Sequence, residues 1–138
     1  GGIMHHPSFI KVDNNNLSGE RIIMPRTSKT MREMLRDVVV EGTGKKADIA
    51  GYEVGGKTGT AERAEFGRYS EKKNMASFVG VFPISKPQYL VFVSFDRPDY
   101  SFNTGGMVAA PVVGNIIRGI NPILGIKPLN MQRNIEGK

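Results

Sequence analysis

The sequence contains no cysteine, and only two of its 138 residues are histidines. Without thiols the chain can form neither a disulfide nor a thiolate metal site, and the adjacent pair His5 and His6 supplies too few ligands to hold a metal. We therefore expect neither a metal centre nor another cofactor. The absence of cysteine leaves the redox compartment open.

Long apolar runs are also missing. No stretch approaches the roughly 20 apolar residues that a membrane span requires. Residues 1–7 lack the basic and apolar regions of a signal peptide. If the protein is exported or anchored, we expect the segments responsible to lie outside this sequence.

Positive charge is in excess but is not concentrated. The net charge is +6, yet the lysines and arginines are spread along the chain without stacking aromatics beside them, so we do not expect nucleic acid as a partner. The hydrophobic fraction of 39% and the charged fraction of 23% are close to globular averages. At this length they predict one folded domain with a single core.

The N-terminal part predicts a short hairpin or an extended lead-in, followed by a helix. Two apolar stretches, Phe9–Val12 and Arg21–Met24, are separated by turn-forming residues. Apolar residues then recur at spacings of three and four, which is typical of an amphipathic helix. Thr27 or Ser28 can cap its start, and Gly42 is placed to end it.

The rest of the chain predicts three strands and a second helix. Gly51–Ala61 mixes β-branched residues and glycines, and Met75–Phe82 and Gln88–Phe95 are rich in valine and aromatics. The last two strands must form an antiparallel hairpin, because the link Pro83–Pro87 is too short for a parallel crossover. Met107–Ile120 carries a helical apolar stripe, and a loose tail is expected after Pro122.

This order of elements predicts an α+β fold, with an antiparallel sheet and helices packed on its face. The sheet is either complete in this chain or part of a larger one.

The sharpest local motif is Lys57-Thr58-Gly59-Thr60. On a strand, Gly59 leaves room for a ligand near the backbone, and the hydroxyls of Thr58 and Thr60 lie on one side. Lys57 is a cation rather than a base, since an alkylammonium group ordinarily keeps its proton far above pH 7. The motif predicts a carboxylate and oxyanion site whose nucleophile comes from elsewhere. The plainer interpretation is a solvated lysine beside strand-forming threonines.

Residues 55–62 resemble the third active-site motif of penicillin-binding proteins with its flanks. The resemblance extends to residues 1–7, 31–44, 76–83 and 106–112, and so covers residues 1 to about 128. Among the class B, monofunctional members, the sequence is most similar to the division-specific septal transpeptidase, judged from Ala61-Glu62 and Tyr69-Ser70.

The resemblance implies a partial penicillin-binding/β-lactamase-like transpeptidase fold, with residues 1–128 as the C-terminal part of the domain and residues 129–138 as a flexible tail. It implies serine acyl transfer that cross-links peptidoglycan stem peptides during septal wall synthesis. Lys57 would contact the serine of the second motif and the substrate carboxylate. Thr58 and Thr60 would bind that carboxylate beside Gly59, and the Thr60 N–H would complete the oxyanion hole.

The implied partners are stem peptides ending in D-Ala-D-Ala, β-lactam antibiotics, and divisome proteins that include a membrane glycosyltransferase. The implied location is the periplasmic face of the inner membrane, with an N-terminal anchoring helix that is not in this sequence.

The sequence departs from the family order, which is Ser-x-x-Lys, then Ser-x-Asn, then Lys-Thr/Ser-Gly. Formal matches occur at Ser8–Lys11, Ser70–Lys73 and Ser101–Asn103. None is expected to be catalytic, because the first follows Pro7 in an extended stretch and the others come after Lys57. We therefore expect a piece of a longer enzyme that is inactive alone, with a strand edge left exposed.

Other interpretations stay open at this point. Gly51–Thr58 satisfies the P-loop pattern, and Leu90–Asp96 could imitate a strand ending in a magnesium ligand, but a P-loop needs a helix that starts at the lysine. A serine β-lactamase or D,D-carboxypeptidase fragment would share the Lys57 motif. A non-catalytic module that binds peptidoglycan or a divisome partner is the remaining alternative.

Overall fold

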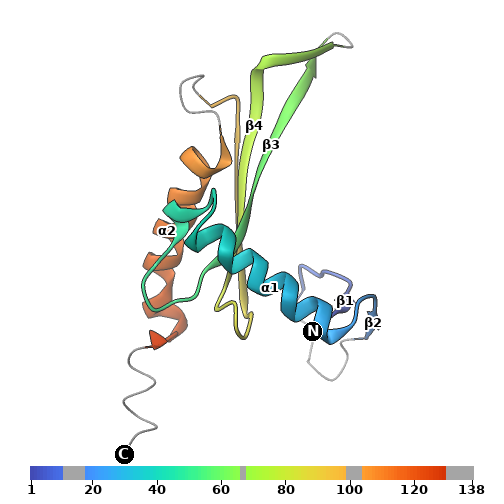
Figure 1. The fold of residues 1–138 in the computed structure, drawn as a ribbon, viewed down its shortest axis with the longest axis vertical. Helices are drawn as coiled ribbons and strands as arrows, with labels where there is room; N and C mark the ends of the chain where they lie inside the picture. Colours follow the sequence, from blue (N-terminus) through green and yellow to red (C-terminus); the bar gives the residue numbers. More distant parts are fainter. Residues whose placement is uncertain (11–17, 66–67, 99–103, 130–138) are drawn as a thin grey trace, which may run out of the picture.

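The computed structural model describes residues 1–10, 18–65, 68–98 and 104–129. Within them a three-stranded antiparallel sheet has the order β3-β4-β5, and the two long helices pack against it (Figure 1). The α+β class is therefore confirmed. The elements are β1 (Ile3–His5), β2 (Gly19–Arg21), α1 (Pro25–Val40), the 3-10 helix η2 (Lys45–Ala47), β3 (Gly55–Glu65), β4 (Arg68–Phe82), β5 (Tyr89–Asp96) and α2 (Gly105–Leu124).

The β4–β5 hairpin forms as its short link requires, with Phe82 opposite Tyr89 and Met75 opposite Asp96. Strand β3 pairs antiparallel with β4, and the two run together as a ribbon beyond the rest of the molecule (Figure 1). The predicted start of β3 was wrong. Gly51 has a φ of +86° and lies in a turn in which the Tyr52 N–H donates to the Ile49 carbonyl at 3.1 Å, and the residues from there to Val54 are in no strand.

Helix α1 begins earlier than the capping pattern predicted. Pro25 occupies the first helical turn, where its missing N–H costs nothing and its fixed φ suits the helix. Thr27 and Ser28 therefore lie inside the helix, and Met24 is an N-cap without a side-chain hydrogen bond. Gly42 does follow the helix end, and its N–H donates to the Asp37 carbonyl at 3.1 Å.

The N-terminal hairpin exists, but its strands were misplaced. Ile3–His5 pairs with Gly19–Arg21, whereas Phe9 is fully exposed outside any strand. Residues 11 and 12 of the predicted first strand lie outside the described residues.

Helix α2 is longer than the predicted Met107–Ile120. It continues to Leu124, with Pro122 in its last turn, and Gly125 ends it with a left-handed φ of +67°. This extension contradicts the expected loose tail directly after Pro122. The helix also contradicts the expectation about apolar runs, since it is long and apolar enough to cross a membrane. Its buried face packs on β4 and β5, so in this structure it is a core helix. Of the predicted tail, residues 130–138 lie outside the described part of the chain.

The core lies between α2 and the sheet. Phe78 and Phe82 of β4 are fully buried against Val113 and Ile117 of α2. Each phenylalanine contributes roughly 1.5–3 kcal/mol through removal of its ring from water. This packing holds the start of α2 against the middle of β3, where the motif lies.

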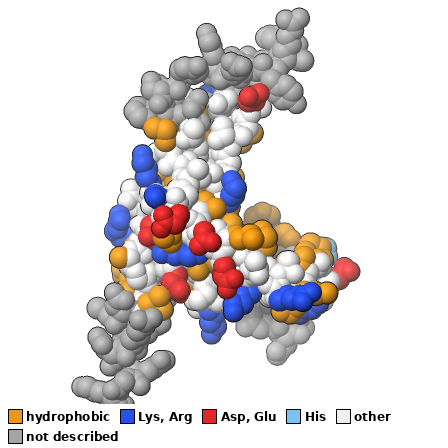
Figure 2. Space-filling model, in the orientation of Figure 1, with side chains coloured by type: hydrophobic (Ala, Val, Ile, Leu, Met, Phe, Trp, Pro, Cys, Tyr) orange, Lys and Arg blue, Asp and Glu red, His pale blue; other side chains and the backbone are white. Residues whose placement is uncertain are grey.

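Hydrophobic side chains also remain on the surface around α1 and the β1–β2 hairpin, on the face that Figure 2 shows. Contiguous exposed apolar patches are typical of surfaces that contact another protein or domain. The exposed large side chains here are Ile3, Met4, Ile22, Ile23, Met24, Met31 and Met34.

Candidate active site

The Lys57–Thr60 motif lies on β3, which is an edge strand of the described sheet. One side of the strand is paired with β4, with Thr58 opposite Phe78 and Thr60 opposite Ala76. No strand of the described part pairs with its other side, so backbone groups along this edge are available to a ligand. The P-loop interpretation is wrong, because that loop requires a helix to begin at Lys57.

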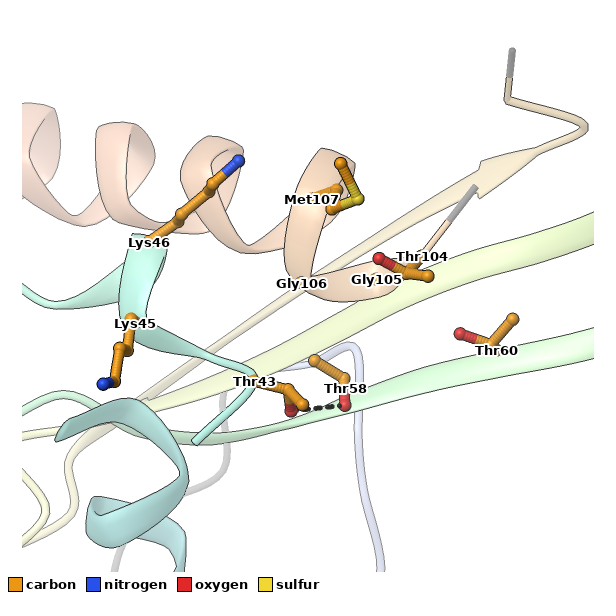
Figure 3. Close-up of a pocket in the computed structure, with 9 residues that line it drawn as sticks. All are labelled: Thr43, Lys45, Lys46, Thr58, Thr60, Thr104, Gly105, Gly106 and Met107. Carbon is orange, nitrogen blue, oxygen red and sulfur yellow. Dashed lines mark hydrogen bonds between the residues drawn. The ribbon is translucent and has the colours of Figure 1, made fainter. Parts of the chain in front are cut away.

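A cavity of about 440 Å³ lies beside this strand (Figure 3). The side chains of Thr58 and Thr60 both line it, so the two threonines share one side of the strand as its alternation predicts. Three chain segments build the wall: β3, the start of α2, and the turn with η2 that follows α1. The lining residues are Thr43, Lys45, Lys46, Thr58, Thr60, Thr104, Gly105, Gly106 and Met107.

The Lys57 side chain is exposed and folds back along the strand. Its Nζ donates to the Thr58 carbonyl at 2.9 Å and lies 3.4 Å from Thr58 Oγ1. The ammonium charge therefore sits directly beside the Thr58 hydroxyl. Lys45 and Lys46 also line the cavity, and the Lys45 ammonium group forms an exposed pair with Glu41 at 3.8 Å. The electrostatics favour an anion.

Glycines allow the start of α2 to touch the motif strand. A Cβ on Gly105 would overlap the Ser77 carbonyl oxygen and come within 2.9 Å of the Gly59 oxygen. A Cβ on Gly106 would overlap the Thr43 carbonyl oxygen. The helix N-terminus, with its partial positive charge, is thereby held at the cavity.

The structure gives a reason for glycine at position 59 that differs from the predicted one. A Cβ at this position would lie 2.5 Å from Ser77 Oγ, the hydroxyl of the neighbouring strand. That hydroxyl in turn donates to the Gly59 carbonyl at 3.4 Å. The side of the strand opposite the cavity is therefore filled by Ser77.

Of the serines in the formal Ser-x-x-Lys and Ser-x-Asn matches, only Ser8 has a described side chain, and it is not among the residues that line the cavity. Ser8 is exposed, lies outside any helix, and exchanges hydrogen bonds with the backbone of Ile10 at 3.0 Å. Lys11 and Ser101–Asn103 lie outside the described residues, as do the side chains of Ser70–Lys73.

Sequence reasoning found the β3 residues but missed Thr43, Thr104 and the two glycines of α2. The only local signals were turn-forming residues after α1 and a threonine before a helix. Neither shows which distant strand the residue will meet.

Comparisons with known proteins support the resemblance. The family model described as the penicillin binding protein transpeptidase domain matches residues 1–118. The chain is 45% identical over 116 residues to Stage V sporulation protein D of Bacillus subtilis, covering 84% of this chain and 18% of that protein. It is 39% identical over 123 residues to the probable peptidoglycan D,D-transpeptidase FtsI of Caulobacter vibrioides, covering 79% of this chain and 21% of that protein.

Solved structures agree. The transpeptidase domain of penicillin-binding protein 3 from Burkholderia pseudomallei is 36% identical, with a TM-score of 0.82 over 92% of this chain and 39% of that one. Penicillin-binding protein 3 from Mycobacterium tuberculosis, complexed with ampicillin, is 28% identical, with a TM-score of 0.75 over 92% of this chain and 32% of that one. The chain thus spans about a fifth of the two sequence relatives. On this evidence the chain belongs to the transpeptidase domain family of class B penicillin-binding proteins.

Proposed function

We propose that this chain forms the carboxylate-binding and oxyanion side of the active site of a peptidoglycan D,D-transpeptidase. The observation that carries the proposal is the position of Lys57–Thr60 on the free edge of β3, beside a cavity whose lining includes Thr43, Thr58, Thr60 and Thr104. A D-Ala-D-Ala stem peptide ends in a carboxylate, which these groups would bind.

In the proposed reaction a serine hydroxyl attacks the carbonyl of the penultimate D-alanine and loses its proton to a base. The C–N bond breaks, the terminal D-alanine leaves as an amine that takes up a proton, and an ester remains on the serine. An amine of a neighbouring stem peptide then attacks this ester, which forms the cross-link and returns the proton to the serine. A β-lactam would acylate the same serine.

Each residue of the motif has a proposed role. Lys57 attracts the carboxylate, a contact worth roughly 1–4 kcal/mol at about 4 Å depending on the local dielectric. Thr58 and Thr60 donate their hydroxyl protons to it. The Thr60 N–H stabilises the oxyanion, and loss of one such donor typically lowers the rate by about 10²–10³-fold. Gly59 makes room for Ser77 on the other face of the strand, so that the motif can stay paired with β4.

The nucleophile is proposed to come from sequence outside these 138 residues. The exposed apolar surface around α1 and the β1–β2 hairpin supports contact with a larger domain. The isolated 138-residue piece is therefore expected to form no covalent adduct with penicillin, while the full-length protein does.

The direct test is covalent labelling of the full-length protein with fluorescent penicillin. We expect Lys57→Ala to slow acylation by about tenfold or more, since a charge-assisted contact is worth roughly 1.5–3 kcal/mol. Lys86→Ala is the matched control, because Lys86 is an exposed lysine in the β4–β5 link, away from the cavity. Equal acylation of wild type and Lys57→Ala would contradict the role of Lys57.

We further propose that the full-length protein acts at the periplasmic face of the inner membrane, held there by a membrane anchor, with divisome proteins and a glycosyltransferase as partners. Septal wall synthesis is the proposed process. Because one relative of the chain is named as a sporulation protein, the septal role needs a test of its own. Depletion should block septum completion. Normal septa in depleted cells would contradict the septal role and leave the acyl-transfer chemistry unaffected. The non-catalytic alternative predicts no penicillin adduct on any form of the protein.

A further inference from the structure

Thr43 contacts the motif strand through its side chain. It lies in the turn after α1, and its Oγ1 is 3.1 Å from the Oγ1 of Thr58. The two hydroxyls form a hydrogen bond in which either atom could be the donor, and Figure 3 shows them facing each other. Thr43 is fifteen residues from Thr58 in sequence and belongs to a different segment.

The other contacts of Thr58 indicate which of the two hydroxyls is the donor. A threonine hydroxyl has one proton and two acceptor lone pairs, whereas an ammonium group can only donate. Lys57 Nζ, 3.4 Å away, already approaches Thr58 Oγ1 as a donor. If Thr43 also donates, both lone pairs of Thr58 Oγ1 are used. The only capacity left on Thr58 is then its own proton, which must find an acceptor elsewhere.

The acceptor that fits is an anion in the cavity. A carboxylate has acceptor oxygens only, so it requires the hydroxyls around it to donate. A Thr58 that donated to Thr43 would instead turn a lone pair toward the carboxylate, which is repulsive. The orientation in which Thr43 donates to Thr58 is therefore the one that a bound carboxylate favours.

The backbone of Thr43 is held in place on both sides. The next residue, Gly44, donates its N–H to the Val38 carbonyl of α1 at 2.9 Å, and a Cβ on Gly44 would lie 2.9 Å from the Phe78 ring. The Thr43 carbonyl packs directly on Gly106 of α2. The hydroxyl is thus presented to Thr58 from a turn that two helices and the core hold in position.

We infer that Thr43 is a positioning residue for the substrate carboxylate: it donates to Thr58 Oγ1 and so directs the Thr58 hydroxyl proton toward the carboxylate. The inference rests on the proposed function, because it assigns the anion in the cavity to the carboxylate of a stem peptide or penicillin.

The test compares acylation of the full-length protein by benzylpenicillin and by its methyl ester, which lacks the negative charge. Thr43→Val removes the hydroxyl and keeps the shape of the side chain. We expect it to slow acylation by benzylpenicillin by about 3- to 10-fold, because the Thr58 bond to a charged acceptor is weakened rather than deleted. Acylation by the ester should change by less than about twofold, because the ester presents no carboxylate to orient.

Two variants serve as controls. Thr43→Ser keeps the hydroxyl and should react with benzylpenicillin within about twofold of wild type. Thr30→Val makes the same chemical change at an exposed position on α1 and should alter neither reaction. If Thr43→Val fails to fold, Thr43→Ala takes its place, since Thr43 is exposed and truncation there leaves no cavity in the core.

A double-variant cycle gives an independent readout. In a Thr58→Val background the Thr43→Val change should have no further effect on benzylpenicillin acylation, because the hydroxyl through which it acts is gone. Equal slowing with acid and ester, or additive losses in the cycle, would overturn the inference and leave the proposed function standing. A wild-type protein that benzylpenicillin does not acylate would overturn the proposed function itself.

Discussion

Two alanine substitutions in helix α2 should have opposite effects, because the two glycines they replace have different surroundings. Gly105 is buried at the start of the helix, where a Cβ would overlap the Ser77 carbonyl oxygen and approach the Gly59 oxygen to 2.9 Å. Both obstacles are backbone atoms of the sheet, so no side-chain rotation can relieve the overlap. At Gly119, in the same helix, nothing lies within 4 Å of the added Cβ.

The magnitudes follow from these surroundings. Gly119→Ala should stabilise the protein by about 0.5–1 kcal/mol, because alanine loses less backbone entropy than glycine on entering a helix. Gly105→Ala should destabilise it by about 1–3 kcal/mol, the usual cost of an added methyl group that a packed site cannot accommodate. For a domain of roughly 150–250 residues, each kcal/mol shifts the Tm by about 2–4 °C.

Thermal unfolding of the full-length protein, followed by calorimetry, measures both shifts. We expect a higher Tm for Gly119→Ala and a lower Tm for Gly105→Ala. Penicillin acylation should also fall for Gly105→Ala alone, because the displaced helix start would move Gly59 and with it the motif. Shifts of the same sign, or a Gly105→Ala protein as stable as wild type, would show that α2 does not press on the strand in this way.

Other substitutions test the packing and the motif. Phe78→Ala should lower the unfolding free energy by about 3–5 kcal/mol in denaturant titrations, since it empties a fully buried site. Arg36→Ala should lower the unfolding free energy by about 1–3 kcal/mol, because the Arg36 guanidinium donates at 2.7 Å to both the Asp48 carboxylate and the Val54 carbonyl. Lys29→Ala should change it by less than about 0.5 kcal/mol, because it breaks only an exposed ion pair with Glu33 at 3.9 Å. Fluorescent-penicillin labelling should fall for Lys57→Ala and stay unchanged for Lys86→Ala, and equal labelling of the two would count against the proposed site.

The local sequence pattern predicted which helices and strands form better than it predicted where each one begins and ends. The short link between the last two strands allowed only one connection, so the β4–β5 hairpin was predictable from its length. The start of α1 was not, because Thr27 and Ser28 are good capping residues and nothing local showed that Pro25 would begin the helix. In α2, Pro122 suggested an end, yet it lies in the last turn, where its missing N–H removes a single helical hydrogen bond.

The residues of the site were also predictable only in part. Lys57–Thr60 is contiguous, so a strand assignment was enough to place both hydroxyls on one side. Thr43 reaches Thr58 only because α1, β3 and α2 converge, and that convergence depends on packing between distant segments. A single sequence carries no periodic signal for it.

Helix α1 packs closely on the start of β3 at Gly55. The other end of the helix carries the β1–β2 hairpin (Figure 1). A Cβ on Gly55 would lie 3.3 Å from the Arg36 backbone nitrogen and 2.6 Å from Ile84 Cδ1, so a side chain at this position would be tight against the helix and would overlap Ile84. We therefore expect any side chain larger than hydrogen at Gly55 to push α1 away from β3 and to disturb the residues just before Lys57.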